Sequence, residues 1–142
     1  MMQDDSQGLG APAVTIPQSQ DRKKILLIED DPFLLQMYND KFVNEGYEVN
    51  VAHDGLEGLK MLNEKQVDLV LLDILIPKLS GVDLLTKIKE DPKLQKMPII
   101  ALTNLSNVKE EQDVKAKGVN EYLIKSDYTP TQVVEIVKKY LP

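Results

Sequence analysis

Charged and hydroxyl side chains stand at the ends of four short apolar runs in this chain. The residues in this position are Glu29, Asp30, Asp73, Thr103 and Lys125. The carboxyl ends of parallel strands lie on one edge of a sheet, and ligands bind there at the point where the strand order reverses. If the runs are strands of such a sheet, we therefore expect these side chains to meet in one crevice.

Three carboxylates in one crevice would repel one another. Two like charges about 4 Å apart cost about 1 kcal/mol in water and about 4 kcal/mol at an effective dielectric constant of 20. Lys125 is the only cation that the pattern places beside Glu29, Asp30 and Asp73. Mg²⁺ is a natural complement, because it takes oxygen ligands and often binds one or two carboxylates together with a phosphate.

This set of groups indicates phosphoryl transfer. A carboxylate beside Mg²⁺, a lysine and a threonine hydroxyl can together hold the oxygens of a phosphoryl group in transfer. The pattern therefore favours Asp73 as a nucleophile that forms an acyl phosphate, with Thr103 and Lys125 beside it.

The elements that must position these residues alternate along the chain. Apolar residues recur at three- and four-residue intervals between the short runs, as in amphipathic helices; one such stripe is Leu56, Leu59 and Leu62. The runs themselves are typical of strands and occupy residues 25–28, 48–52, 69–72, 99–102 and 122–124. The alternation predicts an α/β fold, a doubly wound parallel sheet of five strand–helix units with helices on both faces.

Capping residues mark the expected helix ends. Asp54 with Glu57, and Thr129 with Gln132, have the spacing of capping boxes. Further helix starts and stops are predicted from the capping preferences of Asn, Ser and Gly at Ser80, Asn107, Gly46 and Gly118.

Composition argues against several classes of protein. With 17 Lys and Arg against 23 Asp and Glu, the net charge is −6, which disfavours nucleic acid as a direct partner. The chain has no cysteine, so it forms no disulfide or thiolate metal site, as is usual in a reducing cytoplasm. The longest nearly apolar stretch, residues 69–76, is interrupted by Asp73 and is too short to cross a bilayer. We expect a cytoplasmic protein with no membrane partner.

Residues 1–22 differ from the rest of the chain. Gln, Ser, Gly, Asp and Pro dominate there, and no apolar segment could form the core of a signal peptide. We expect a disordered N-terminal tail over residues 1–22 and one folded domain over residues 23–142, since the length allows one domain of ordinary size.

Four motifs together resemble the receiver domain of two-component response regulators. They are ILLIEDDP at residues 25–32, DLVLLDILIP followed by SG at 68–81, ALT at 101–103 and YLIK at 122–125. In this order and spacing they are specific, and the likeness covers residues 23–142. The resemblance is to single-domain, chemotaxis-type receivers, and it implies a flavodoxin-like (βα)5 sheet with strand order 2-1-3-4-5.

The resemblance also implies a role for each polar residue. Asp73 matches the phosphoacceptor, Asp30 the direct Mg²⁺ ligand, and Glu29 the second acidic residue, which usually reaches the metal through water. The backbone carbonyl of Leu75 would be a further ligand.

Three other positions match residues that respond to the phosphoryl group. Thr103 matches the hydroxyl that moves toward a phosphoryl oxygen, and Lys125 the side chain that forms an ion pair with that group. Tyr122 matches the aromatic switch position of the family. A tyrosine near a sheet edge is also commonly half-buried packing with its hydroxyl in water, so both interpretations of Tyr122 stay open here.

By the same likeness, the chain is a phosphoacceptor and not a multi-turnover enzyme. A sensor histidine kinase or a histidine phosphotransfer protein would donate to Asp73, and the receiver's own site would catalyse its phosphorylation and a slow dephosphorylation. His53 is the only histidine and is predicted to be a surface residue, so the donor is another molecule. Because the last helix ends near Pro142, we expect output by binding of an unidentified downstream protein or by relay to another histidine.

Two departures from the family pattern are expected to matter. Ser126 stands where the family usually has a proline after the lysine. Because a cis peptide bond before a residue other than proline costs about 2.5–4 kcal/mol, we expect a trans Lys125–Ser126 bond and an altered loop. Leu75 and Leu105 replace polar groups that help to position the hydrolytic water in the family, and we expect a long-lived phosphoryl group.

Three alternative functions share parts of this pattern. A flavodoxin-type cofactor binder would need a hydroxyl- and glycine-rich phosphate loop after the first strand, where the acidic triplet at 29–31 would repel phosphate. An aspartate-nucleophile phosphatase would need a second Asp as general acid at the position of Leu75. A pseudo-receiver that is folded but never phosphorylated is disfavoured by the presence of Asp73, Thr103 and Lys125.

Overall fold

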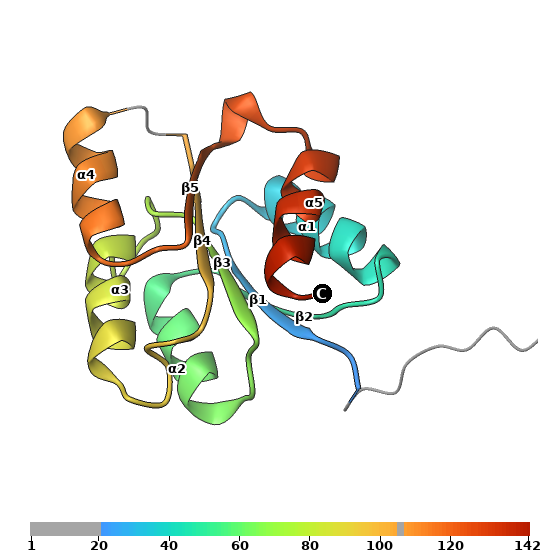
Figure 1. Ribbon diagram of the computed structural model, residues 1–142, viewed down its shortest axis with the longest axis horizontal. Coiled ribbons are helices and arrows are strands. Elements are labelled where there is room, and N and C mark those ends of the chain that lie inside the picture. Colours follow the sequence, from blue (N-terminus) through green and yellow to red (C-terminus); the bar gives the residue numbers. More distant parts are fainter. Residues whose placement is uncertain (1–20, 105–106) are drawn as a thin grey trace, which may run out of the picture.

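The computed structural model describes residues 21–104 and 107–142 and contains one parallel sheet of five strands (Figure 1). The strands are β1 (Lys24–Ile28), β2 (Glu48–Ala52), β3 (Leu69–Leu72), β4 (Ile99–Thr103) and β5 (Glu121–Ile124). Their order is β2-β1-β3-β4-β5, and every neighbouring pair is parallel. The expected strand order is confirmed, and each strand begins and ends within one residue of the predicted run. Most of the predicted tail, residues 1–20, and Leu105 lie outside the described residues.

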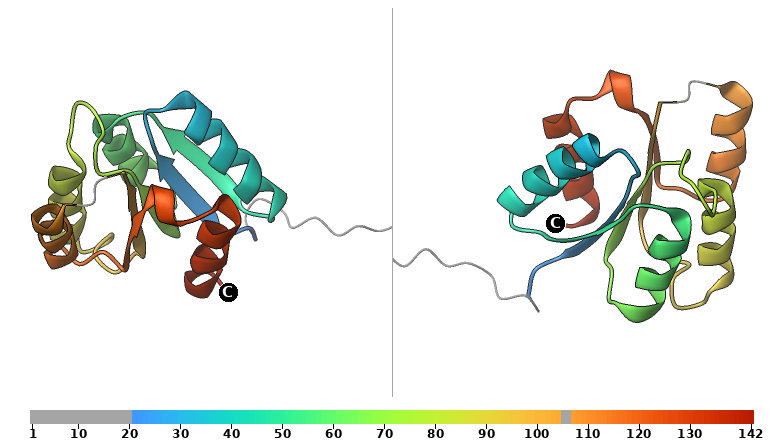
Figure 2. Two further views of the ribbon diagram at one scale, coloured as in Figure 1. Left: turned by 90° about the horizontal axis from the view of Figure 1, so that it is seen from above. Right: turned by 180° about the vertical axis from the view of Figure 1, so that it is seen from behind.

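In the described part of the chain, five α-helices cover the two faces of the sheet, with α1 and α5 on one face and α2, α3 and α4 on the other (Figures 1 and 2). A single turn of 3₁₀-helix, Lys125–Asp127, joins β5 to α5. The helices are α1 (Pro32–Asn44), α2 (Gly55–Glu64), α3 (Gly81–Glu90), α4 (Val108–Ala116) and α5 (Pro130–Tyr140).

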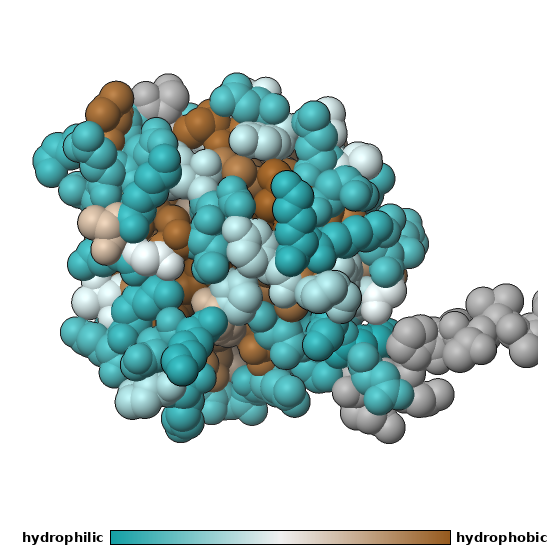
Figure 3. Space-filling view, viewed as in Figure 1, coloured by the Kyte–Doolittle hydropathy of each residue, from teal (hydrophilic) through white to brown (hydrophobic). Residues whose placement is uncertain are grey.

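Alternate strand residues enter two separate cores. In β1, Ile25 and Leu27 pack in the core under α1 and α5, whereas Leu26 and Ile28 pack in the core under α2, α3 and α4. Burial on both faces explains why this strand is continuously apolar. The outer surface is mostly hydrophilic in the view of Figure 3. No helix in residues 21–104 and 107–142 has the length and apolarity needed to cross a membrane.

Most predicted helix ends are confirmed, and two local predictions are wrong. Thr129 and Gln132 form a complete capping box, but Asp54 and Glu57 form only half of one. Asp54 accepts from the Glu57 N–H, whereas the Glu57 carboxylate accepts from the His53 N–H at 2.7 Å instead of from Asp54. Leu56, expected in the buried stripe of α2, is 53% exposed; it lies in the first turn of this helix, beyond the edge of the core.

Backbone hydrogen bonds continue past the carboxyl ends of two central strands. The Glu29 N–H donates to the Ala52 carbonyl at 3.0 Å, and the Asp73 N–H donates to the Ile28 carbonyl at 3.0 Å. The residues that follow β1 and β3 are thus held in the sheet's own register, which fixes the direction in which their side chains leave the edge.

The connection from β3 to α3 packs tightly against the start of α2. The Gly55 N–H donates to the Pro77 carbonyl at 3.2 Å, and a Cβ on Gly55 would lie 1.9 Å from the Leu79 carbonyl oxygen. Between these two contacts, Lys78 has a φ of 71°, which is uncommon for a residue other than glycine, and its ammonium lies 3.5 Å from the Asp54 carboxylate. This packing holds the segment that leads away from Asp73.

We expect Gly55→Ala to lower the free energy of unfolding by about 1–3 kcal/mol, because the added methyl group forces α2 and the β3–α3 connection apart. Urea unfolding followed by circular dichroism measures the change. Asn63→Ala, at an exposed position of the same helix, is the matched control and should change stability by less than about 0.5 kcal/mol. Equal stability of the two variants would contradict the close approach.

Candidate phosphoryl-transfer site

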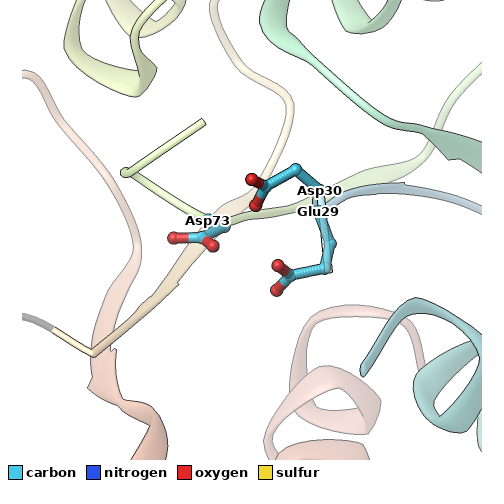
Figure 4. Close-up of side chains that lie close together, drawn as sticks. All are labelled: Glu29, Asp30 and Asp73. Carbon is cyan, nitrogen blue, oxygen red and sulfur yellow. The ribbon is translucent and has the colours of Figure 1, made fainter. Parts of the chain in front are cut away.

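Three carboxylates converge at the carboxyl edge of the sheet (Figure 4). Glu29 and Asp30 follow β1, and Asp73 follows β3. Each of the three offers one oxygen within 4.8 Å of the others. Glu29 and Asp73 are buried, with exposed fractions of 3% and 7%, whereas Asp30 is exposed. The predicted convergence of acidic residues is therefore present.

Lys125 joins the two buried carboxylates. Its Nζ donates to Glu29 Oε1 at 2.6 Å and to Asp73 Oδ2 at 3.1 Å. The lysine side chain is 9% exposed, and it enters the site from the first residue after β5. The ammonium is thus the counter-charge that the sequence pattern placed beside the acidic residues.

Backbone N–H groups hold the other oxygens of the same two carboxylates. The Asp31 N–H donates to Glu29 Oε2 at 3.1 Å, and the Leu75 N–H donates to Asp73 Oδ1 at 3.0 Å. Asp31 itself accepts from the Phe33 N–H and caps α1. Each buried carboxylate is therefore fixed at both oxygens, one by Lys125 and one by the main chain.

Burial and charge act against each other on the pKa values of this cluster. Burial is the largest influence on Glu29 and raises its pKa, the hydrogen bond from Lys125 lowers it, and the nearby Asp73 charge raises it again; the net result is a raised pKa. For Lys125, burial lowers the pKa, but the hydrogen bond to Glu29 and the charges of both carboxylates outweigh it, so this pKa lies above its ordinary value. Lys125 therefore stays charged at neutral pH.

Thr103 and Tyr122 lie on the face of the sheet that α4 covers. Thr103 is the last residue of β4 and is fully buried. Tyr122 pairs in register with Ala101, two residues before Thr103, and packs against the core under α2, α3 and α4. Burial raises the pKa of the Tyr122 hydroxyl, and the charges of Glu110 and Glu111 raise it further. The half-buried Tyr122 therefore lies between α4 and the face of the sheet to which Thr103 belongs.

A hollow of about 300 Å³ opens over the carboxylates. Asn104, the residue after Thr103, lines it and is exposed. Asn104 was not among the site residues predicted from the sequence. The only sequence feature that could have indicated it is its position directly after Thr103. The full lining is Glu29, Asp30, Asp31, Leu34, Asp73, Leu75, Asn104 and Lys125.

The donor set of this hollow suits a hard divalent cation. Three carboxylates place oxygens within 4.8 Å of one another, and oxygen ligands are those that Mg²⁺ prefers. Asp30 is the exposed member of the three and makes no hydrogen bond or ion pair within residues 21–104 and 107–142. Among the three carboxylates it is thus the one most available to a metal ion.

Comparison with known proteins points to one family. A family model described as the response regulator receiver domain matches residues 25–138. The polar-differentiation response regulator DivK of Brucella anthropi is 30% identical over 119 residues, which cover 84% of this chain and 96% of that protein.

Solved structures agree with this match. The phosphorylated cyanobacterial phytochrome response regulator RcpA superposes with a TM-score of 0.74 and 31% identity, over 83% of this chain and 90% of that one. The receiver domain of the sensor histidine kinase PA1611 from Pseudomonas aeruginosa superposes with a TM-score of 0.76 and 25% identity, over 84% of this chain and 97% of that one. The latter has a magnesium ion coordinated in its active site cleft.

We expect Lys125→Met to lower the free energy of unfolding in metal-free buffer at neutral pH by about 3 kcal/mol, because it leaves buried carboxylates without a counter-charge. Chemical denaturation measures the change. The matched control is Lys138→Met, which removes an ammonium 2.8 Å from Glu45. That lysine is 44% exposed, so the control should cost less than about 1 kcal/mol. Equal losses in the two variants would contradict the role of Lys125 as a buried counter-charge.

Proposed function

This chain belongs to the response regulator receiver domain family, and we propose that it signals by accepting a phosphoryl group on Asp73. The single observation that carries the proposal is the buried ion pair of Lys125 with both Asp73 and Glu29. It orients the Asp73 carboxylate in the lining of an open hollow, where a nucleophile can reach a phosphoryl donor.

The chain's own residues have distinct parts in the transfer. An Asp73 oxygen attacks the phosphorus of a phosphohistidine; the P–O bond forms as the P–N bond breaks, and the electron pair goes to the imidazole nitrogen. Lys125 and the Thr103 hydroxyl bind phosphoryl oxygens. Glu29, Asp30, Asp73 and the backbone carbonyl of Leu75 would hold Mg²⁺, which when bound neutralises charge on the carboxylates and the phosphoryl group.

Phosphorylation redistributes charge in the site. The acylated Asp73 oxygen loses its negative charge, while the phosphoryl group brings about −1.5 to −2. Lys125 then pairs with the phosphoryl group in place of Asp73, and Thr103 moves toward a phosphoryl oxygen. Tyr122, on the same sheet face as Thr103 and next to α4, follows this movement. The surface of α4, β5 and α5 thereby shifts between two arrangements with different affinity for a partner.

Receiver domains of this family interact with histidine kinases or phosphotransfer proteins. For this chain the donor is the phosphohistidine of a sensor kinase or phosphotransfer protein in the cytoplasm. The output is binding of a downstream protein or relay to another histidine. The protein is a phosphoacceptor that catalyses its own phosphorylation and a slow dephosphorylation.

An aspartate-nucleophile phosphatase is the enzymatic alternative. It requires a general acid two residues after the nucleophile, and Leu75, which lines the hollow with 56% of its surface exposed, cannot donate a proton. The observations on the site therefore favour a phosphoacceptor over a phosphatase.

Incubation with acetyl phosphate and Mg²⁺ should add one phosphoryl group to the protein, read by intact mass. The addition should be absent without metal and absent in Asp73→Asn. Asp83→Asn, at an exposed carboxylate of α3, is the matched control and should be phosphorylated like the natural sequence. Phosphorylation of Asp73→Asn to the same extent would refute the assignment.

Leu75→Asn should shorten the half-life of the phosphoryl group by about fivefold, because one new hydrogen bond of about 1 kcal/mol can orient the attacking water. Release of inorganic phosphate from the purified phosphoprotein measures the half-life. Leu56→Asn replaces another exposed leucine, outside the lining of the hollow, and should leave the half-life unchanged. A natural phosphoprotein that decays within seconds would contradict the proposed persistence.

A further inference from the structure

The hollow at the site holds many more hydrogen-bond acceptors than donors. Four of its lining residues are carboxylates, Glu29, Asp30, Asp31 and Asp73, and two are leucines. The Lys125 ammonium is already shared between Glu29 and Asp73, and the backbone N–H groups of Asp31 and Leu75 are bound to the same carboxylates. A phosphoryl group brings several acceptor oxygens and negative charge, so a further donor besides Lys125 and Thr103 would stabilise it.

Asn104 is the one neutral side chain in the described lining that can donate a hydrogen bond. Its side chain is exposed, and it makes no hydrogen bond to any other residue in the described part of the chain. A second, mostly apolar hollow between α1 and the start of α5 shares only Leu34, Asn104 and Lys125 with the acidic one. Asn104 therefore lies where the two hollows meet, and the carboxamide N–H groups of its side chain have no partner among the described residues.

The strand order places Asn104 on the side of Asp73 that faces away from Glu29 and Asp30. It follows Thr103, whose strand β4 lies next to β3 and therefore next to Asp73. Lys125 enters from β5, on the other side of β4. Glu29 and Asp30 follow β1, across β3 from Asn104. An anion on Asp73 thus has acidic groups and any metal toward β1, and Asn104 with Lys125 toward β4 and β5.

We propose that the Asn104 carboxamide binds the phosphoryl group on Asp73, donating a hydrogen bond to a phosphoryl oxygen. This inference rests on the proposed function, since it names a further residue of the same site. A hydrogen bond from a neutral donor to a charged acceptor contributes more than one between neutral groups, and it forms without adding charge to the crowded carboxylates. Asn104 is thereby a binding residue for the phosphoryl state and not for the resting state.

The test measures binding of beryllofluoride, a phosphoryl mimic, in the presence of Mg²⁺ by ¹⁹F NMR on the full chain. Asn104→Ala should weaken binding about tenfold, as expected for loss of one hydrogen bond to a charged group. Asn104→Asp, which keeps the shape but sets a negative charge against the anion, should weaken it further. Asn63→Asp makes the same change of charge at an exposed position of α2 and should bind within about twofold of the natural sequence, given the screening of exposed charges.

Two further measurements distinguish loss of the proposed hydrogen bond from loss of metal binding or of stability in Asn104→Ala. Magnesium affinity without beryllofluoride should be unchanged in Asn104→Ala, because the carboxamide is not a metal ligand, and the thermal unfolding of this variant should match the natural protein. Natural-like beryllofluoride binding by Asn104→Ala would overturn the inference while leaving the phosphoacceptor role of Asp73 intact. Failure of the natural protein itself to bind the mimic would overturn the proposed function, and this inference with it.

Discussion

The site depends on one ammonium group that offsets two buried carboxylates. Glu29 and Asp73 would repel each other at the edge of the sheet, and burial adds to the cost of their charges. Lys125 makes the arrangement stable, with contacts of 2.6 and 3.1 Å to the two carboxylates. The contact with Lys125 and the backbone N–H of Leu75 also fix the orientation of the Asp73 carboxylate. Any event that changes the charge of Asp73 must therefore change the partners of Lys125.

The fold supplies this interaction from three separate strands. Glu29 follows β1, Asp73 follows β3 and Lys125 follows β5, and only the parallel sheet brings these ends to one edge. Apolar strands buried on both faces are rigid supports, because close packing tolerates little displacement. The backbone N–H groups of Asp31 and Leu75 add direction to the carboxylates. A rigid edge of this kind lets a small change of charge shift the positions of neighbouring groups such as Thr103 and Tyr122.

The convergence of the polar strand ends could be predicted from the pattern of apolar runs, whereas the strand order was implied by the resemblance to the receiver family. The runs at 69–72 and 99–102 lie in buried strands. The residue that follows a strand therefore leaves the sheet at a position that the strand's alternation already determines. Contacts between particular side chains were less predictable. The complete capping box expected at Asp54 does not form, because the Glu57 carboxylate accepts from the His53 N–H instead of from the Asp54 N–H. The sequence pattern does not distinguish between these two neighbouring N–H donors. Asn104 was not predicted as a site residue, because an asparagine after a strand is common. Its place in the lining of the hollow is visible only in the structure.

In the proposed function, one particular carboxylate, Asp73, becomes the acyl phosphate. Reduction of the phosphorylated protein with borohydride converts an aspartyl phosphate to homoserine, and peptide mass spectrometry then locates the modified residue. We expect homoserine at position 73 and at no other acidic position. Homoserine at position 30 or at a surface aspartate position, with residue 73 unmodified, would contradict the role of Asp73 as the phosphoacceptor.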